Sequence, residues 1–159
     1  MSNIKSLAEI IALRASFKKI KKKVVFTNGV FDIIHAGHVD YLVKAKAMGD
    51  VLIVGLNSDT SVKRIKGEKR PVVPETQRAF VLSNIKPVDY VVIFEEDTPA
   101  NLVEKIIPDT LIKGADWAIN DIVGKDIVLK NGGEVKTIEF INFQSTSNII
   151  KTILENYKK

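Results

Sequence analysis

The 159-residue sequence contains no cysteine. A disulfide scaffold, a thiol nucleophile and any zinc site built on thiolates are therefore excluded. No apolar run approaches the roughly 18 residues that a membrane-spanning helix needs, and the N-terminus lacks the pattern of a signal peptide. We therefore expect a cytoplasmic protein with no membrane partner.

Two common phosphate-binding motifs are also missing. There is no G-x-x-x-x-G-K-[ST], which argues against a P-loop NTPase, and no G-x-G-x-x-G after the first apolar run, which argues against a dinucleotide oxidoreductase. The excess of 24 basic over 19 acidic residues favours anionic partners of some kind. Aromatic residues make up only 7% and do not alternate with basic ones. The basic excess suggests, as an alternative of another class, a non-catalytic nucleotide- or RNA-binding module. The low aromatic content argues against that alternative, so we expect no nucleic-acid partner.

The sequence does contain an alternation of strand and helix patterns. Short apolar runs predict strands at 24–26, 51–54, 88–94, 110–112 and 135–138, and helical spacing predicts helices at 2–17, 38–48, 75–85, 99–107 and 121–130. Such alternation is typical of an α/β domain, here a Rossmann-like open parallel sheet of about five strands with helices on both faces. We divide the chain into an N-terminal helical extension (1–22) and one domain (23–159).

Several local features are interpreted structurally at this point. Thr98 is expected to be the N-cap of the helix that Pro99 begins. Residues 63–74, rich in Lys, Arg, Gly and Pro, are expected to form a mobile basic loop. Asp59 and Asp97 are interpreted as helix caps, and Arg78 as a solvated surface charge.

The two histidines of the chain lie together, directly after the first apolar run. His35 and His38 flank Gly37 and lead into a helix. Ligands bind at the carboxyl ends of parallel strands, and free N–H groups at a helix start, together with imidazoles, can donate hydrogen bonds to phosphate oxygens. Two other interpretations stay open: polar residues around a helix cap, and an incomplete metal site that carboxylates would have to complete.

The segment 27–38, T-N-G-V-F-D-I-I-H-A-G-H, resembles the signature of the H-x-G-H nucleotidyltransferase superfamily. The remaining sequence is most similar to the adenylyltransferase domain of bacterial ADP-heptose synthases. This similarity rests on L-N-S-D at 56–59, K-G at 66–67, R-P-V at 70–72, Q-R at 77–78, F-E-E-D-T-P at 94–99, K-G-A-D at 113–116, N-G-G-E-V at 131–135 and S-T-S at 145–147. It extends from about residue 23 to the C-terminus.

The resemblance implies transfer of AMP from ATP to D-glycero-β-D-manno-heptose 1-phosphate, giving ADP-heptose and pyrophosphate for lipopolysaccharide core synthesis. It implies ATP with Mg²⁺ and a phosphorylated sugar as ligands, a homodimer, and a separate upstream sugar kinase, because the chain has no room for a fused kinase domain. The alternative is cytidylyl transfer from CTP to a polyol phosphate such as glycerol 3-phosphate. The lack of a basic residue shortly before Ser145 weakens that alternative.

The resemblance also implies residue roles. The implied catalytic residues are His35, His38 and a loop lysine, Lys66. The implied nucleotide-binding residues are Thr27, Asn28, Gly29, Phe31, Gly37, Lys63, Gly114, Asp116, Ser145, Thr146 and Ser147. The implied substrate-binding residues are Asp32, Asn57, Lys113 and Trp117, with Asp32 also near the metal. For Trp117, a place in the core is the alternative.

Overall fold

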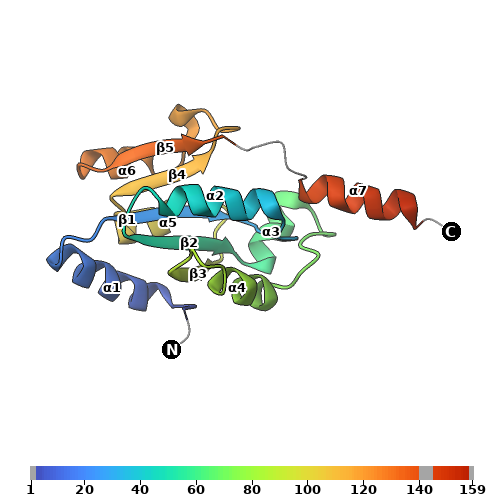
Figure 1. Cartoon of the computed structure of the whole chain (residues 1–159), viewed down its shortest axis with the longest axis horizontal. Helices are drawn as coiled ribbons and strands as arrows, with labels where there is room; N and C mark the ends of the chain where they lie inside the picture. The colour runs from blue at the N-terminus through green and yellow to red at the C-terminus, as the bar shows by residue number, and fades with distance from the viewer. Residues whose placement is uncertain (1–2, 140–144, 158–159) are drawn as a thin grey trace.

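A five-stranded parallel sheet forms the centre of the computed structural model, which describes residues 3–139 and 145–157 (Figure 1). The strands are β1 (Val24–Gly29), β2 (Val51–Asn57), β3 (Tyr90–Phe94), β4 (Thr110–Gly114) and β5 (Glu134–Ile138). Their order in the sheet is β3-β2-β1-β4-β5. All five predicted strands are present, and the predicted fold class is confirmed.

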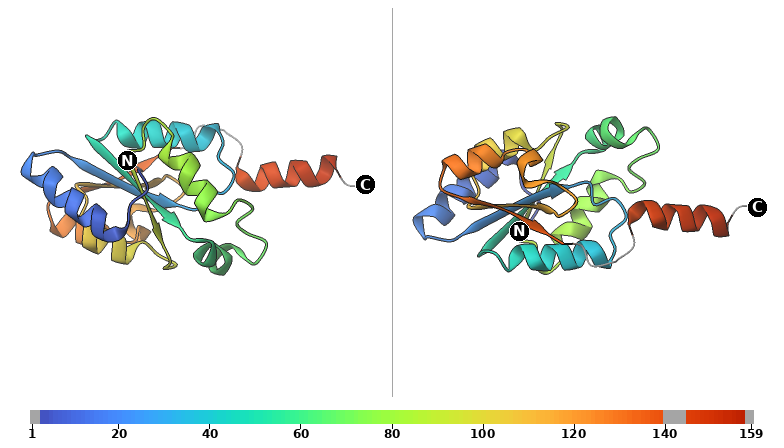
Figure 2. Two further views of the ribbon diagram at one scale, coloured as in Figure 1. Left: turned by 90° about the horizontal axis from the view of Figure 1, so that it is seen from below. Right: turned by 90° about the horizontal axis from the view of Figure 1, so that it is seen from above.

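Seven α-helices and one 3₁₀ helix are described: α1 (Leu7–Lys19), α2 (Ala36–Lys46), α3 (Asp59–Lys66), α4 (Glu75–Ser83), α5 (Ala100–Ile106), η1 (Ile119–Asp121), α6 (Lys125–Lys130) and α7 (Thr146–Asn156). Helices α2 and α4 cover one face of the sheet, and α1, α5 and α6 cover the other (Figure 2). The central strands are apolar along almost their whole length because helices cover both faces. Val25 and Leu52 pack with α2 and α4, whereas Val24 and Phe26 pack with α1, α5 and α6.

The N-terminal helix α1 packs against the sheet. Its start is a capping box, in which the Ser6 hydroxyl accepts the Glu9 N–H and the Glu9 carboxylate accepts the Ser6 N–H. Ile10 is completely buried in the same core cluster as Phe26. Arg14 reaches the loop before β4 and pairs with Asp109 at 2.8 Å. The predicted helical extension is therefore packed onto the predicted domain.

Several predicted helix boundaries were wrong. α2 begins at Ala36, two residues before the predicted start, because His35 itself is the N-cap. The prediction for Thr98 was also wrong: α5 begins at Ala100, with Pro99 in the N-cap position and no side-chain cap. The predicted helix at 121–130 is instead the short turn η1 followed by α6.

α7 extends away from the sheet in all three views (Figures 1 and 2). The Ser145 hydroxyl accepts the Asn148 N–H at 3.1 Å and so caps the helix, and no residue of α7 is buried. No helix within residues 3–139 and 145–157 is long and apolar enough to cross a membrane.

Candidate active site

A pocket of about 790 Å³ opens at the carboxyl end of the sheet. β1 leads to β2 and β3 on one side, whereas β4 and β5 lie on the other, so the strand order reverses between β1 and β4. Open α/β sheets bind ligands at such a reversal. The pocket gathers these predicted residues: Asn28, Gly29, Phe31, Asp32, His35, Gly37, His38, Asn57, Lys66, Lys113, Gly114, Asp116, Trp117, Ser145, Thr146 and Ser147.

Two predicted residues, Thr27 and Lys63, do not line the pocket. Thr27 is buried, and its hydroxyl is hydrogen-bonded to the hydroxyl of the pocket residue Tyr41 at 2.7 Å. Thr27 therefore positions a lining residue without lining the pocket itself. The sequence analysis missed eight lining residues: Val30, Tyr41, Ile65, Arg70, Asp97, Thr98, Pro99 and Val123. Tyr41 was detectable in principle, because it lies three positions after His38 on the same helix face.

The two imidazoles lie side by side at the start of α2. Their ring centroids are 4.0 Å apart, and the His38 ring also lies 5.3 Å from that of Phe31. His35 Nδ1 accepts a hydrogen bond from the Gly37 N–H at 3.2 Å. Because Nδ1 is an acceptor, a neutral His35 carries its proton on Nε2, where it can donate to a ligand. One interpretation left open, the helix cap, is therefore correct for His35, and the cap still leaves a donor free.

The environment of both histidines favours the neutral imidazole. Burial lowers the pKa of His35, and burial together with the neighbouring His35 lowers the pKa of His38 to about 4. Among the described residues, buried His38 Nδ1 has no hydrogen-bond partner, and neither does Asn28 Oδ1. The pair therefore offers hydrogen bonds to a phosphate rather than positive charge.

The turn after β1 is shaped by Gly29 and Phe31. Phe31 has φ 46°, in the left-handed region, and its ring folds back over the turn. A Cβ at position 29 would lie 3.0 Å from that ring. A larger residue at position 29 would therefore displace the Phe31 ring by a few tenths of an ångström, which glycine avoids.

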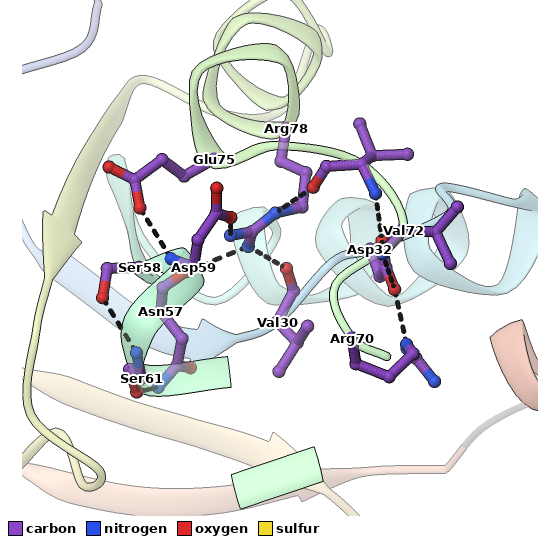
Figure 3. A network of polar contacts seen from close by, with 11 residues as sticks. Val30, Asp32, Asn57, Ser58, Asp59, Ser61, Arg70, Val72, Glu75 and Arg78 are labelled. Carbon is purple, nitrogen blue, oxygen red and sulfur yellow. Dashed lines mark hydrogen bonds and ion pairs between the residues drawn. The ribbon is translucent and has the colours of Figure 1, made fainter. Parts of the chain in front are cut away.

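Asp32 holds the loop between α3 and α4 (Figure 3). Oδ1 accepts the Val73 N–H at 2.8 Å and the Val72 N–H at 2.9 Å, and Oδ2 accepts the Arg70 Nε–H at 2.6 Å and the Val72 N–H at 3.0 Å. Burial alone raises the pKa of Asp32, but these hydrogen bonds outweigh it, so the pKa lies below its usual value and the side chain is a carboxylate. Its lone pairs are occupied by the loop.

Arg78 was wrongly interpreted as a surface charge, since it is only 1% exposed. Its guanidinium donates to the carbonyls of Val30 (2.6 Å), Asn57 (2.9 Å) and Val73 (2.9 Å) and pairs with Asp59 at 2.7 Å (Figure 3). It thus ties the β1 turn, the end of β2 and the loop before α4 together. A single Arg in a helix pattern gives no sign of such tertiary contacts.

The predictions for residues around α3 need three corrections. Residues 63–66 are the last turn of α3, not a loop; Ser58 caps the helix, and it ends at Gly67, whose φ is 95°. Asp59 is not the cap but the partner of Arg78. Asp97 is not a cap either, because it pairs with Arg64 at 2.7 Å. Lys66 faces the pocket as predicted, although from a helix.

The opposite wall comes from β4 and the start of α7. Burial lowers the pKa of Lys113 to about 8, although the nearby Asp116 opposes this shift. The ammonium lies 3.4 Å from the Asn28 carbonyl and 5.4 Å from the ring centroid of Trp117. Trp117 is 46% exposed, so it is not core filler. The Thr146 hydroxyl donates to the Ile33 carbonyl at 3.4 Å, which places the start of α7 at the pocket.

The described residues contain no group of three His, Cys, Asp or Glu side chains that could hold a metal ion. The metal interpretation of the His-x-x-His motif therefore finds no third ligand in that part of the chain. The loop contacts of Asp32 also do not fit its predicted role as a metal ligand. A magnesium ion that binds mainly through substrate phosphates needs no such protein cage.

The family described as cytidylyltransferase-like matches residues 26–152. The chain belongs to this cytidylyltransferase-like family. The resemblance to H-x-G-H nucleotidyltransferases that the segment 27–38 indicated is thereby confirmed. The matched range contains every lining residue of the pocket.

Two relatives named bifunctional protein HldE are similar over nearly the whole chain. The bifunctional protein HldE of Citrifermentans bemidjiense is 50% identical over 156 residues, which is 98% of this chain and 32% of the relative. The bifunctional protein HldE of Campylobacter concisus is 56% identical over 153 residues, which is 96% of this chain and 30% of the relative. The chain thus spans about a third of the length of these relatives.

Solved structures agree with this assignment. A lipopolysaccharide core biosynthesis protein from Thermoplasma volcanium superposes with a TM-score of 0.63 at 30% identity, covering 77% of this chain and 99% of that one. A pantoate-β-alanine ligase from Francisella tularensis superposes with a TM-score of 0.61 at 16% identity, covering 91% of this chain and 68% of that one. The second likeness concerns the fold alone.

Proposed function

We propose that this chain transfers AMP from ATP to D-glycero-β-D-manno-heptose 1-phosphate, giving ADP-heptose and pyrophosphate. The observation that carries the proposal is the pair of adjacent imidazoles at the start of α2, with ring centroids 4.0 Å apart in a large pocket. The heptose acceptor rests on the resemblance to ADP-heptose synthases, and the identity of 50–56% to bifunctional HldE proteins supports it.

The chemistry needs no strong base. An oxygen of the sugar phosphate, already anionic near neutral pH, attacks the α-phosphorus in line, a new P–O bond forms, and the bond to the pyrophosphate oxygen breaks. Catalysis is then positioning plus stabilisation of the developing charge. Neutral His35 and His38 supply hydrogen bonds, and the ammonium groups of Lys66 and Lys113 supply positive charge. The N–H groups at the starts of α2 and α7 add donors.

We also propose that ATP arrives with Mg²⁺, which neutralises charge on the triphosphate when bound. The enzyme would work in the cytoplasm as a homodimer. Its sugar 1-phosphate must come from a sugar kinase.

Pyrophosphate release tests this proposal directly. ATP and CTP are each supplied with heptose 1-phosphate, other sugar 1-phosphates and glycerol 3-phosphate. The expected result is the highest kcat/KM for ATP with heptose 1-phosphate. Faster release from CTP with a polyol phosphate would replace the proposal with cytidylyl transfer. Nucleic-acid binding with a steep salt dependence and no pyrophosphate release would contradict both.

A further inference from the structure

We propose that Arg70 binds a terminal phosphate group of one of the two substrates and that Asp32 is the positioning residue that aims it. The inference rests on the proposed function, which supplies two candidates for that phosphate group. They are the phosphate monoester of the acceptor and the triphosphate of the nucleotide. The sequence analysis assigned Arg70 no role.

The position of Arg70 is set by two contacts. Its N–H donates to the Gly67 carbonyl at 3.0 Å, which closes the turn after α3. Its Nε–H donates to Asp32 Oδ2 at 2.6 Å, with side chains that are 19% exposed for Arg70 and 1% exposed for Asp32. Because the N–H groups of Val72 and Val73 also bind Asp32, the whole loop is anchored to the same carboxylate. The guanidinium is therefore fixed at its inner edge.

The outer edge of the guanidinium makes no hydrogen bond to the described part of the chain. The two terminal amino groups of Arg70 make no hydrogen bond with any described residue, although the side chain lines the pocket. Arg78, in contrast, uses all three of its nitrogen atoms on protein oxygens. A mostly buried guanidinium with two parallel free amino groups matches the bidentate geometry of phosphate.

The surroundings of Arg70 suit an anion. Lys66 lines the same pocket from the last turn of α3, and Lys113 lines it from β4. Asp32 is the only carboxylate that contacts Arg70 among the described residues, and its oxygens are already occupied by the loop. The pocket that Arg70 lines therefore carries these two lysines together with the carboxylates of Asp97 and Asp116.

Steady-state kinetics of three variants test the proposal. Arg70→Gln removes the guanidinium, Arg70→Lys keeps the charge without the fork, and Lys69→Gln is the matched control, because it removes a charge from an exposed neighbour in the same loop. Both Arg70 variants should raise the KM of one substrate about tenfold to a hundredfold, with little change in kcat or in the other KM. Lys69→Gln should leave both KM values within about twofold of wild type.

The substrate whose KM rises identifies the source of the phosphate: heptose 1-phosphate for the monoester, ATP for the triphosphate. If both KM values stay within about twofold, or if only kcat falls together with the melting temperature, the proposal is wrong and Arg70 is structural. Asp32→Asn should reproduce the KM effect more weakly, since it loosens the guanidinium without removing it.

Calorimetric titration separates this proposal from the proposed function. Inorganic phosphate and inorganic pyrophosphate are titrated into wild type and Arg70→Gln without any turnover. Binding of either anion that is at least about tenfold weaker in the variant supports the Arg70 site. If wild type also releases no pyrophosphate with any acceptor, only the proposed function is contradicted. Equal or undetectable binding of both anions in both proteins overturns the Arg70 site.

Discussion

Replacing Arg78 should destabilise the protein far more than replacing a surface arginine with similar contacts. The guanidinium of Arg78 satisfies the carbonyls of Val30, Asn57 and Val73 and pairs with Asp59. Arg78→Met removes every one of these contacts and leaves three carbonyls near the pocket floor without their donor.

The magnitude follows from burial. Breaking a buried ion pair costs about 3–5 kcal/mol, and an unsatisfied buried carbonyl costs about 1–3 kcal/mol. Because the Asp59 side chain is 35% exposed and regains water, the loss of the ion pair itself falls at the low end. With each of the three carbonyls also at its low end, we expect Arg78→Met to lower the free energy of unfolding by about 6 kcal/mol, out of the roughly 5–15 kcal/mol that domains possess. The corresponding fall in melting temperature is about 15 °C.

Arg64→Met is the matched control. Arg64 also pairs through its guanidinium, with Asp97 at 2.7 Å, but its side chain is 45% exposed. Exposed ion pairs contribute about 0–1 kcal/mol, so this variant should change little. Urea denaturation followed by circular dichroism measures both variants. Equal losses in the two, or a loss below about 1 kcal/mol for Arg78→Met, would refute the reasoning.

Three further predictions concern the histidines and Lys113. His38→Ala should keep the fold by circular dichroism and lower the rate of pyrophosphate release at least about a hundredfold; near-normal turnover would contradict its role. Burial lowers the pKa of Lys113 to about 8, so activity should fall as pH rises through 8, and Lys113→Arg, which stays charged, should flatten that limb of the pH profile. Folding lowers the pKa of His38 from 6.5 to about 4, so the unfolded chain binds more protons between these values. Resistance to urea should therefore decrease from pH 6.5 to pH 4, and less steeply in His38→Gln; identical slopes would show that another group causes the loss.

The sheet could be predicted because its signals are local. Val51–Val54 is an uninterrupted β-branched and leucine run, and such runs bounded by polar residues indicate strands buried on both faces. The location of the site followed from the same pattern, since residues directly after buried parallel strands meet at one edge of the sheet. His35 and His38 were found in this way, Lys113 came from the family resemblance, and the pocket brings the three together.

What the sequence could not indicate depends on contacts between distant residues. Asp32 and Arg70 are 38 positions apart, and Arg78 is 48 positions from the carbonyl of Val30 that it binds. Neither contact produces a residue spacing that could be detected in the sequence. The helix α3 was missed for another reason: the charged residues before Gly67 suit the last turn of a helix as well as they suit a loop, and only the cap at Ser58 distinguishes the two.

Because the histidines favour the neutral form, other side chains must supply the positive charge of the site. If His35 and His38 are neutral, the positive charge that a triphosphate meets comes from Lys66, Arg70 and Lys113. Arg70 donates a hydrogen bond to Asp32, Asp32 accepts the N–H of Val73, and the carbonyl of Val73 accepts from Arg78. Preorganised donors are effective because they need not rearrange during the reaction. The Arg78 substitution should consequently raise substrate KM even at temperatures where the variant remains folded, because the guanidinium of Arg70 would lose its fixed position.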